Sequence, residues 1–125
     1  METQERAKVE RLISALPETD QLTEFCPRYH HAMEILERRW VGAILRVLIH
    51  GPHRFNEILS AIPGLSDRLL TARLRELEAE GLMVRRVLPR SPVQVEYELT
   101  EPGQELSLAV RVISAWAEKW IPHQE

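Results

Sequence analysis

The sequence lacks the features that would place a protein in a membrane or stabilise it by disulfides. Its 125 residues include one cysteine, Cys26, so no intramolecular disulfide can form. No apolar run approaches the roughly 20 residues that a membrane-spanning helix needs. The N-terminal stretch METQERAKVE is charged where a signal peptide has an apolar core. These absences predict a cytoplasmic protein with no membrane partner.

Motifs for enzymatic chemistry and metal binding are missing as well. The sequence has no phosphate-binding glycine loop, no nucleophile elbow, and no paired acid and base in a recognisable setting. Its five histidines form neither an HExxH motif nor a Cys/His cluster. We therefore expect no enzymatic activity, no cofactor and no metal ion.

The net charge of −3 conceals an uneven distribution. Residues 38–90 contain ten arginines against five acidic residues, a local charge of +5, whereas residues 1–37 and 91–125 each sum to −4. A chain of this length suits one domain with extensions. A basic centre with acidic flanks favours a module that binds nucleic acid. The negative total leaves a second interpretation open, a protein–protein interaction module that binds an acidic partner and no DNA.

Periodicity and chain breakers predict several helices and one β-hairpin. A short amphipathic helix is expected at residues 5–16, and a long one from Cys26 to the stop at Gly51 and Pro52. RFNEILSAIP predicts a second short helix. MVRRVL and VQVEYEL, which flank a PRSP turn, indicate a two-stranded antiparallel ribbon. Thr100 can cap a last helix whose apolar stripe, ending near Trp120, needs a partner surface.

The segment LSDRLLTARLRELEAEG, residues 65–81, predicts a helix with two different faces. Ser66 is a good N-cap, and Gly81 stands where a C′ glycine belongs. At about 100° per residue the leucines form a core face, and the opposite side carries Arg68, Thr71, Ala72 and Arg75. Arginine can donate two hydrogen bonds to guanine in a major groove, and a methyl group can contact thymine. For the helix alone, a solvated arginine face is the simpler interpretation.

The neighbouring elements favour DNA binding. A short helix, a tight turn, a second helix and a β-ribbon follow one another in the order of a winged helix-turn-helix. The ribbon carries Arg85, Arg86 and Arg90, which can reach phosphates or a minor groove. We therefore predict a mainly α fold with a small two-stranded antiparallel β-wing.

Three segments also resemble those of a known protein family. CPRYHHAMEILERRW, GPHRFNEILSAIPGLSDRLLTARLRELEAEGLM and VEYELTEPG are similar, in order and spacing, to the HxlR-type bacterial transcriptional regulators. The resemblance implies a homodimer, usually a repressor, that binds a palindromic double-stranded DNA operator. It divides the chain into an N-terminal helical arm (1–25), a winged helix-turn-helix DNA-binding domain (26–100) and a C-terminal dimerisation helix (101–125), with the N-terminal helix also contributing to the dimer.

The resemblance assigns roles to individual residues. Arg54 opens the supporting helix near the DNA backbone, and residues 89–92 form the wing tip. Together with the helix face and the ribbon described above, this gives the predicted DNA-binding residues Arg54, Ser66, Arg68, Thr71, Arg73, Arg75, Arg86 and Arg90. Of these, Arg73 lies on the flank of the reading helix. Family members often carry glycines where this chain has Glu37 and Arg38, so we expect residues 28–49 to be more continuously helical here.

Cys26 is a candidate sensor of oxidants or electrophiles. It lies at or just before a helix N-terminus with Arg28 two residues later, and both features favour a reactive thiol. Some regulators that resemble this chain sense oxidants or electrophiles through the cysteine at this position, and an oxidant or another small molecule is the inducer that the resemblance allows. One cysteine per chain then implies an intersubunit disulfide, a mixed disulfide or an adduct. The alternative is that Cys26 is a small residue that fits the start of a helix.

Overall fold

Six helices and one two-stranded sheet form the part of the chain that the computed structural model describes, residues 3–16 and 25–123. The helices are α1 (Thr3–Ser14), α3 (Pro27–Glu37), α4 (Val41–Leu48), α5 (Phe55–Ala61), α6 (Asp67–Ala79) and α7 (Glu101–Trp120). Strands β1 (Met83–Leu88) and β2 (Gln94–Leu99) pair antiparallel, with Met83 opposite Leu99. The predicted fold class, mainly α with a two-stranded antiparallel wing, is confirmed.

The core lies where α4, α5 and α6 meet the base of the wing. The side chains that are buried there include Ile44, Leu45, Leu48, Ile58, Leu70, Leu74, Leu77, Met83 and Leu99. Burying a leucine or isoleucine side chain contributes roughly 1.5–3 kcal/mol. The three leucines of α6 are the ones that the helical spacing assigns to the core, so the face of α6 opposite to them is turned outward.

Both ends of α6 are defined by the residues that the sequence indicates. The Ser66 hydroxyl oxygen accepts a hydrogen bond from the backbone N–H of Leu69 at 3.1 Å. Gly81 follows the helix with φ +77°, a conformation that residues with a Cβ rarely adopt. These two signals hold the helix to a fixed length between the turn and the wing.

The base of the wing is joined closely to the start of α7. The Thr100 hydroxyl donates to the carbonyl oxygen of Gly81 at 2.7 Å and accepts from the backbone N–H of Gly103 at 3.3 Å. A Cβ on Gly103 would collide with the carbonyl oxygen of Leu82. Only glycine therefore allows α7 to approach the wing this closely.

The prediction of a helix that continues over residues 28–49 is wrong. Helix α3 ends at Glu37, Arg38 is extended with ψ 132°, and Trp40 has φ 76° before α4 begins. A positive φ is costly for a bulky residue and persists only where surrounding contacts enforce it. The Arg39 guanidinium lies 5.1 Å from the indole centroid of Trp40, and a Cβ built on Gly64 would lie 3.4 Å from the same indole.

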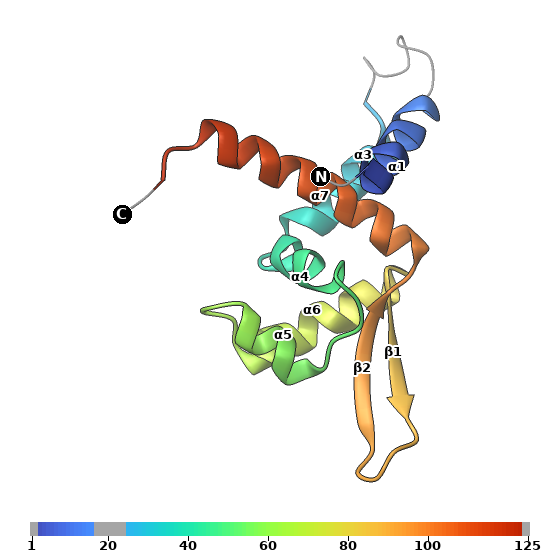
Figure 1. The fold of residues 1–125 in the computed structure, drawn as a ribbon, viewed down its shortest axis with the longest axis vertical. Helices are drawn as coiled ribbons and strands as arrows, with labels where there is room; N and C mark the ends of the chain where they lie inside the picture. The colour runs from blue at the N-terminus through green and yellow to red at the C-terminus, as the bar shows by residue number, and fades with distance from the viewer. Residues whose placement is uncertain (1–2, 17–24, 124–125) are drawn as a thin grey trace.

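Figure 1 shows the β-hairpin projecting away from the helices, with the end of α6 beside its base, and α7 starting at that base and crossing the molecule between the hairpin and α1. The C-terminal half of α7 extends beyond the other helices, and Trp116 and Trp120 there are 58% and 63% exposed. Although α7 has 20 residues, no helix in the described ranges is long and apolar enough to cross a membrane.

Candidate nucleic-acid interface

Two arginines form an exposed ridge on α6, which we call the arginine ridge (Arg68 and Arg75). Both side chains are exposed, and Thr71, on the same face, is half-buried. Among residues 3–16 and 25–123, neither arginine makes a side-chain hydrogen bond or ion pair. The Thr71 hydroxyl donates to the carbonyl oxygen of Asp67 at 2.8 Å. With respect to this part of the chain, the donors of the two guanidinium groups remain available to an external acceptor.

Ser66 and Arg54 lie at the N-termini of the two helices of the helix-turn-helix. Ser66 is exposed, and its hydroxyl oxygen is occupied by the N-cap hydrogen bond. Arg54 is the N-cap residue of α5, and its backbone N–H donates to the Glu57 carboxylate at 2.7 Å. The exposed Arg54 side chain stands at the first turn of the supporting helix.

The wing carries a second group of arginines. Arg86 lies 3.4 Å from the Glu98 carboxylate on the other strand, and Arg90 donates to the side-chain oxygen of Gln94 at 3.0 Å. Arg85 and both of these residues are exposed. Ion pairs and hydrogen bonds in such exposed positions contribute little to stability, so a phosphate can replace the internal partner at small cost.

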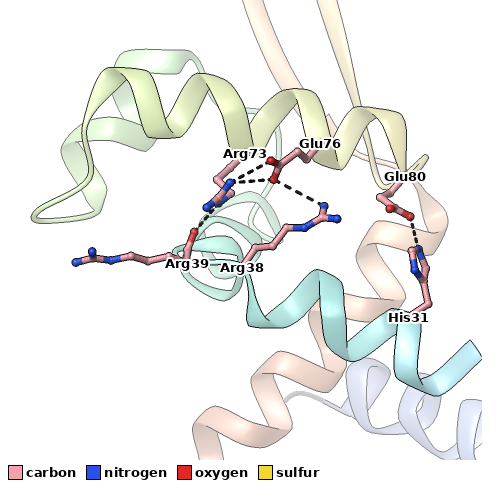
Figure 2. Close-up of polar contacts among 6 residues, drawn as sticks. All are labelled: His31, Arg38, Arg39, Arg73, Glu76 and Glu80. Atoms are coloured by element: carbon pink, nitrogen blue, oxygen red, sulfur yellow. Dashed lines mark hydrogen bonds and ion pairs between the residues drawn. The ribbon is translucent and has the colours of Figure 1, made fainter. Parts of the chain in front are cut away.

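Arg73 does not belong to the arginine ridge. Its Nε donates to the carbonyl oxygen of Arg39 at 2.8 Å, and its Nη1 lies 3.1 Å from both carboxylate oxygens of Glu76. Figure 2 shows the Glu76 carboxylate between Arg73 and Arg38, with the Arg38 contact at 3.7 Å. The Arg73 side chain is only 17% exposed. These contacts join α6 to the junction between α3 and α4.

One more contact connects the same two parts of the chain. His31 of α3 lies 2.9 Å from the carboxylate of Glu80, which follows the end of α6. We call the residues that make these contacts the α3–α6 brace: His31, Arg38, Arg39, Arg73, Glu76 and Glu80. Sequence reasoning missed this set. The sequence contains one local sign of it: Arg73, Glu76 and Glu80 are three and four residues apart, and side chains at these separations are neighbours on a helix surface.

Cys26 is the N-cap of α3, as its sequence position predicts. Its sulfur accepts a hydrogen bond from the backbone N–H of Tyr29 at 3.4 Å, and the residue is exposed. Next to it, Phe25 is 75% exposed, and its ring centroid lies 5.2 Å from that of His30. The thiol is thus accessible to a reagent in solution and is also part of the structure that starts α3.

Comparison with known proteins gives consistent results. A family model described as HxlR-like helix-turn-helix matches residues 35–125. The chain is 48% identical over 99 residues to the HTH-type transcriptional regulator YvaP of Bacillus subtilis (strain 168), across 79% of this chain and 92% of YvaP.

Solved structures of similar sequence share the fold. The reduced form of the regulator YodB from B. subtilis has a TM-score of 0.71 and 40% identity, covering 82% of this chain and 100% of that chain. YodB structures also include a diamide-treated and a quinone-bound form. The redox regulator HypR in its oxidised form has a TM-score of 0.71 and 35% identity, covering 80% of this chain and 99% of that one.

Proposed function

Because this chain belongs to the HxlR-like helix-turn-helix family, we propose that it represses transcription by binding a palindromic operator as a homodimer. Membership in the family makes it an HTH-type transcriptional regulator and not an enzyme. The observation that carries the proposal is the arginine ridge on α6, which is exposed and has no internal partner among the described residues. A helix with this face can lie in a major groove without first breaking contacts of its own.

In the proposed complex, the side chains of α6 contact bases and those around it contact phosphates. Arg68 and Arg75 donate to guanine, and the Thr71 methyl group contacts thymine. Arg54 and the N-terminus of α6 at Ser66 lie near the backbone, where backbone N–H groups and the helix dipole favour an anion. The wing residues Arg86 and Arg90 hold phosphates beside the major-groove site. Arg73 is left out of the proposed reading face because its Nε and Nη1 already have partners inside the chain.

The proposed homodimer uses the apolar side chains that the two terminal helices leave exposed. These are Leu12 and Ile13 on α1 and Val112, Ile113, Trp116 and Trp120 on α7, with Leu16 just after the end of α1. Large exposed apolar surfaces on a single chain mark interaction sites, and aromatic residues are enriched there. This assignment keeps the division into an arm (1–25), a DNA-binding domain (26–100) and a dimerisation helix (101–125), although residues 17–24 of the arm lie outside the described part of the chain.

A footprinting experiment tests the proposal directly. The purified protein is mixed with the DNA that flanks its own gene, and with an unrelated duplex of the same length as control. We expect two protected half-sites about one helical turn, or about 34 Å, apart. Deleting the gene is expected to raise expression from the protected promoter. Equal protection of both duplexes would contradict sequence-specific binding, and protection of neither would leave the protein-interaction module as the better explanation.

We further propose that oxidants and electrophiles act on the regulator through Cys26. Support comes from the exposed thiol at the start of α3 and from the similarity to YodB and HypR, which are known in diamide-treated, quinone-bound and oxidised forms. Diamide accepts two hydrogens as two thiols form one disulfide. With one cysteine per chain, the second thiol comes from the partner subunit or from a small thiol. A quinone instead forms a thioether adduct with the sulfur.

Replacing the thiol by a hydroxyl separates the two roles of Cys26. Cys26→Ser keeps a side-chain acceptor for the N-cap of α3 and removes the reactive sulfur. We expect operator affinity to stay within about twofold of the wild type, while release by diamide or a quinone is lost. Fluorescence anisotropy of a labelled operator, with and without the reagent, measures both quantities. A variant that is still released by diamide would rule out Cys26 as the sensor.

A further inference from the structure

Helix α6 has a third face, which the proposed DNA contacts do not use. At about 100° per residue, Arg73, Glu76 and Glu80 form a stripe that lies between the arginine ridge and the leucines. Each residue of this stripe contacts a residue on α3 or just after it. Figure 2 shows these side chains connecting α6 with α3 and the residues after it. By the helical spacing they point neither into the core nor along the arginine ridge.

The contacts of the α3–α6 brace differ in strength. Arg73 is the most buried charged residue of the brace: its Nε donates to a backbone carbonyl, and its Nη1 lies within hydrogen-bond distance of both carboxylate oxygens of Glu76. The contacts Arg38–Glu76 and His31–Glu80 involve more exposed side chains and contribute less. Glu76 is central because its carboxylate lies between two guanidinium groups.

The junction after α3 also contacts the turn that precedes α6. Trp40, held at φ 76°, places its indole against Gly64 in the turn between α5 and α6. Arg39 lies over the indole of Trp40 and offers its carbonyl oxygen to Arg73. The same three residues that interrupt the helix thus contact both the turn and the middle of α6. Because these contacts are made at separated points along α6, they restrict its rotation about its own axis as well as its distance from α3.

We propose that the α3–α6 brace sets the orientation of α6 relative to α3 and thereby determines how well the protein distinguishes its operator from other DNA. This inference rests on the proposed DNA binding. Hydrogen bonds to base edges need donors placed within about 0.5 Å, whereas contacts with phosphates carry no sequence information. Loosening the brace therefore weakens binding to the operator more than binding to other sequences. The brace residues are positioning residues.

A matched pair of variants on α6 tests the proposal. Glu76→Gln removes the carboxylate that joins Arg38 and Arg73, and Glu78→Gln removes an equal charge from an exposed residue outside the brace. The probes are a duplex that the wild-type protein selects from a randomised library and a scrambled duplex of equal composition. We expect the ratio of the two affinities to fall about tenfold for Glu76→Gln and to stay unchanged for Glu78→Gln.

A second variant removes the geometry and keeps the charge. Arg73→Lys preserves the positive charge, but an ammonium group cannot reproduce the fork that reaches both Glu76 and the Arg39 carbonyl. We expect the affinity for the selected duplex to fall and the affinity for the scrambled duplex to stay unchanged, so that the ratio of the two is lower. Thermal unfolding of each variant is recorded alongside. A lower melting temperature with a wild-type ratio in both Glu76→Gln and Arg73→Lys would show a role in stability alone and overturn the proposal.

The outcomes separate this inference from the proposed function. If the wild-type protein selects no sequence, the proposed function is wrong and the inference falls with it. A different result would contradict the inference alone. In that case the wild-type protein prefers the selected duplex over the scrambled one and Arg75→Ala loses this preference. Both brace variants, however, keep the wild-type ratio of the two affinities.

Discussion

The arginines of α6 fall into two groups that differ in what surrounds them. Arg68 and Arg75 are exposed and, in the described part of the chain, have no internal partner, whereas Arg73 on the same helix is 17% exposed and pairs with Glu76 and the Arg39 carbonyl. The residue type and the helix are the same. Their partners decide whether a guanidinium group positions the helix or remains available to a ligand. Substituting an arginine of the ridge should therefore lower DNA discrimination and leave stability unchanged, whereas substituting Arg73 should lower stability as well as discrimination.

The largest effect is expected when an arginine of the ridge is replaced, and it is an effect on how well the protein distinguishes its operator from other DNA. Arg75→Ala should lower the affinity ratio between operator and scrambled duplex by about thirtyfold, because a bidentate contact with guanine is worth about 2 kcal/mol. The free energy of unfolding should stay within about 0.5 kcal/mol of the wild type, since an exposed, unpaired side chain is removed. Anisotropy titrations and urea unfolding measure the two quantities. A preserved ratio would show that Arg75 is not on the reading face.

A smaller effect, on stability, is expected when Arg73 is replaced. Arg73→Ala should lower the free energy of unfolding by about 1.5 kcal/mol, because Glu76 and the Arg39 carbonyl lose a charge-assisted partner in a partly buried position. Urea unfolding of Arg73→Ala and Arg75→Ala side by side gives the comparison. If both variants unfolded at the wild-type urea concentration, the contrast between the two groups of arginines would disappear.

The smallest effect is expected on the wing. Arg90→Ala should weaken binding to operator and scrambled duplex alike, by about fivefold near physiological salt, because one phosphate contact is lost. The dependence of log K on log salt should flatten by about 1 unit. Titrations at several salt concentrations test this, and the ratio of the two affinities serves as the internal control. A selective loss of operator binding would place Arg90 among the residues that read bases.

Features with local chemical causes could be predicted from the sequence. Ser66 and Gly81 mark the ends of α6 because a hydroxyl cap and a positive φ are properties of single residues. The leucine spacing assigns the buried face of α6 for the same reason, and alternation around the PRSP turn defines the wing. The outward direction of Arg68 and Arg75 follows from the helix geometry once the leucines are fixed.

Features that depend on distant contacts could not be predicted in this way. The break at residues 38–40 leaves the helical spacing of the apolar residues almost intact, so periodicity gives no sign of it. Trp40, with its positive φ, places its indole against Gly64, which lies 24 positions further along the chain. On the α3 side of the brace, Arg73 donates to the backbone carbonyl of Arg39. Every residue has such a carbonyl, so the sequence does not indicate which one is the partner. Only the folded chain brings these groups together.

Because the start of α7 is fixed against the base of the wing, a small tilt of the helix produces a large displacement at its other end. Gly103 and Thr100 fix its first turn against Leu82 and Gly81, and the helix continues for 20 residues, or about 30 Å. A tilt of about 5° over this length displaces the opposite end by about 2.5 Å. An angular change too slight to disturb side-chain packing along α7 is therefore still large, at Trp120, on the scale of one hydrogen bond.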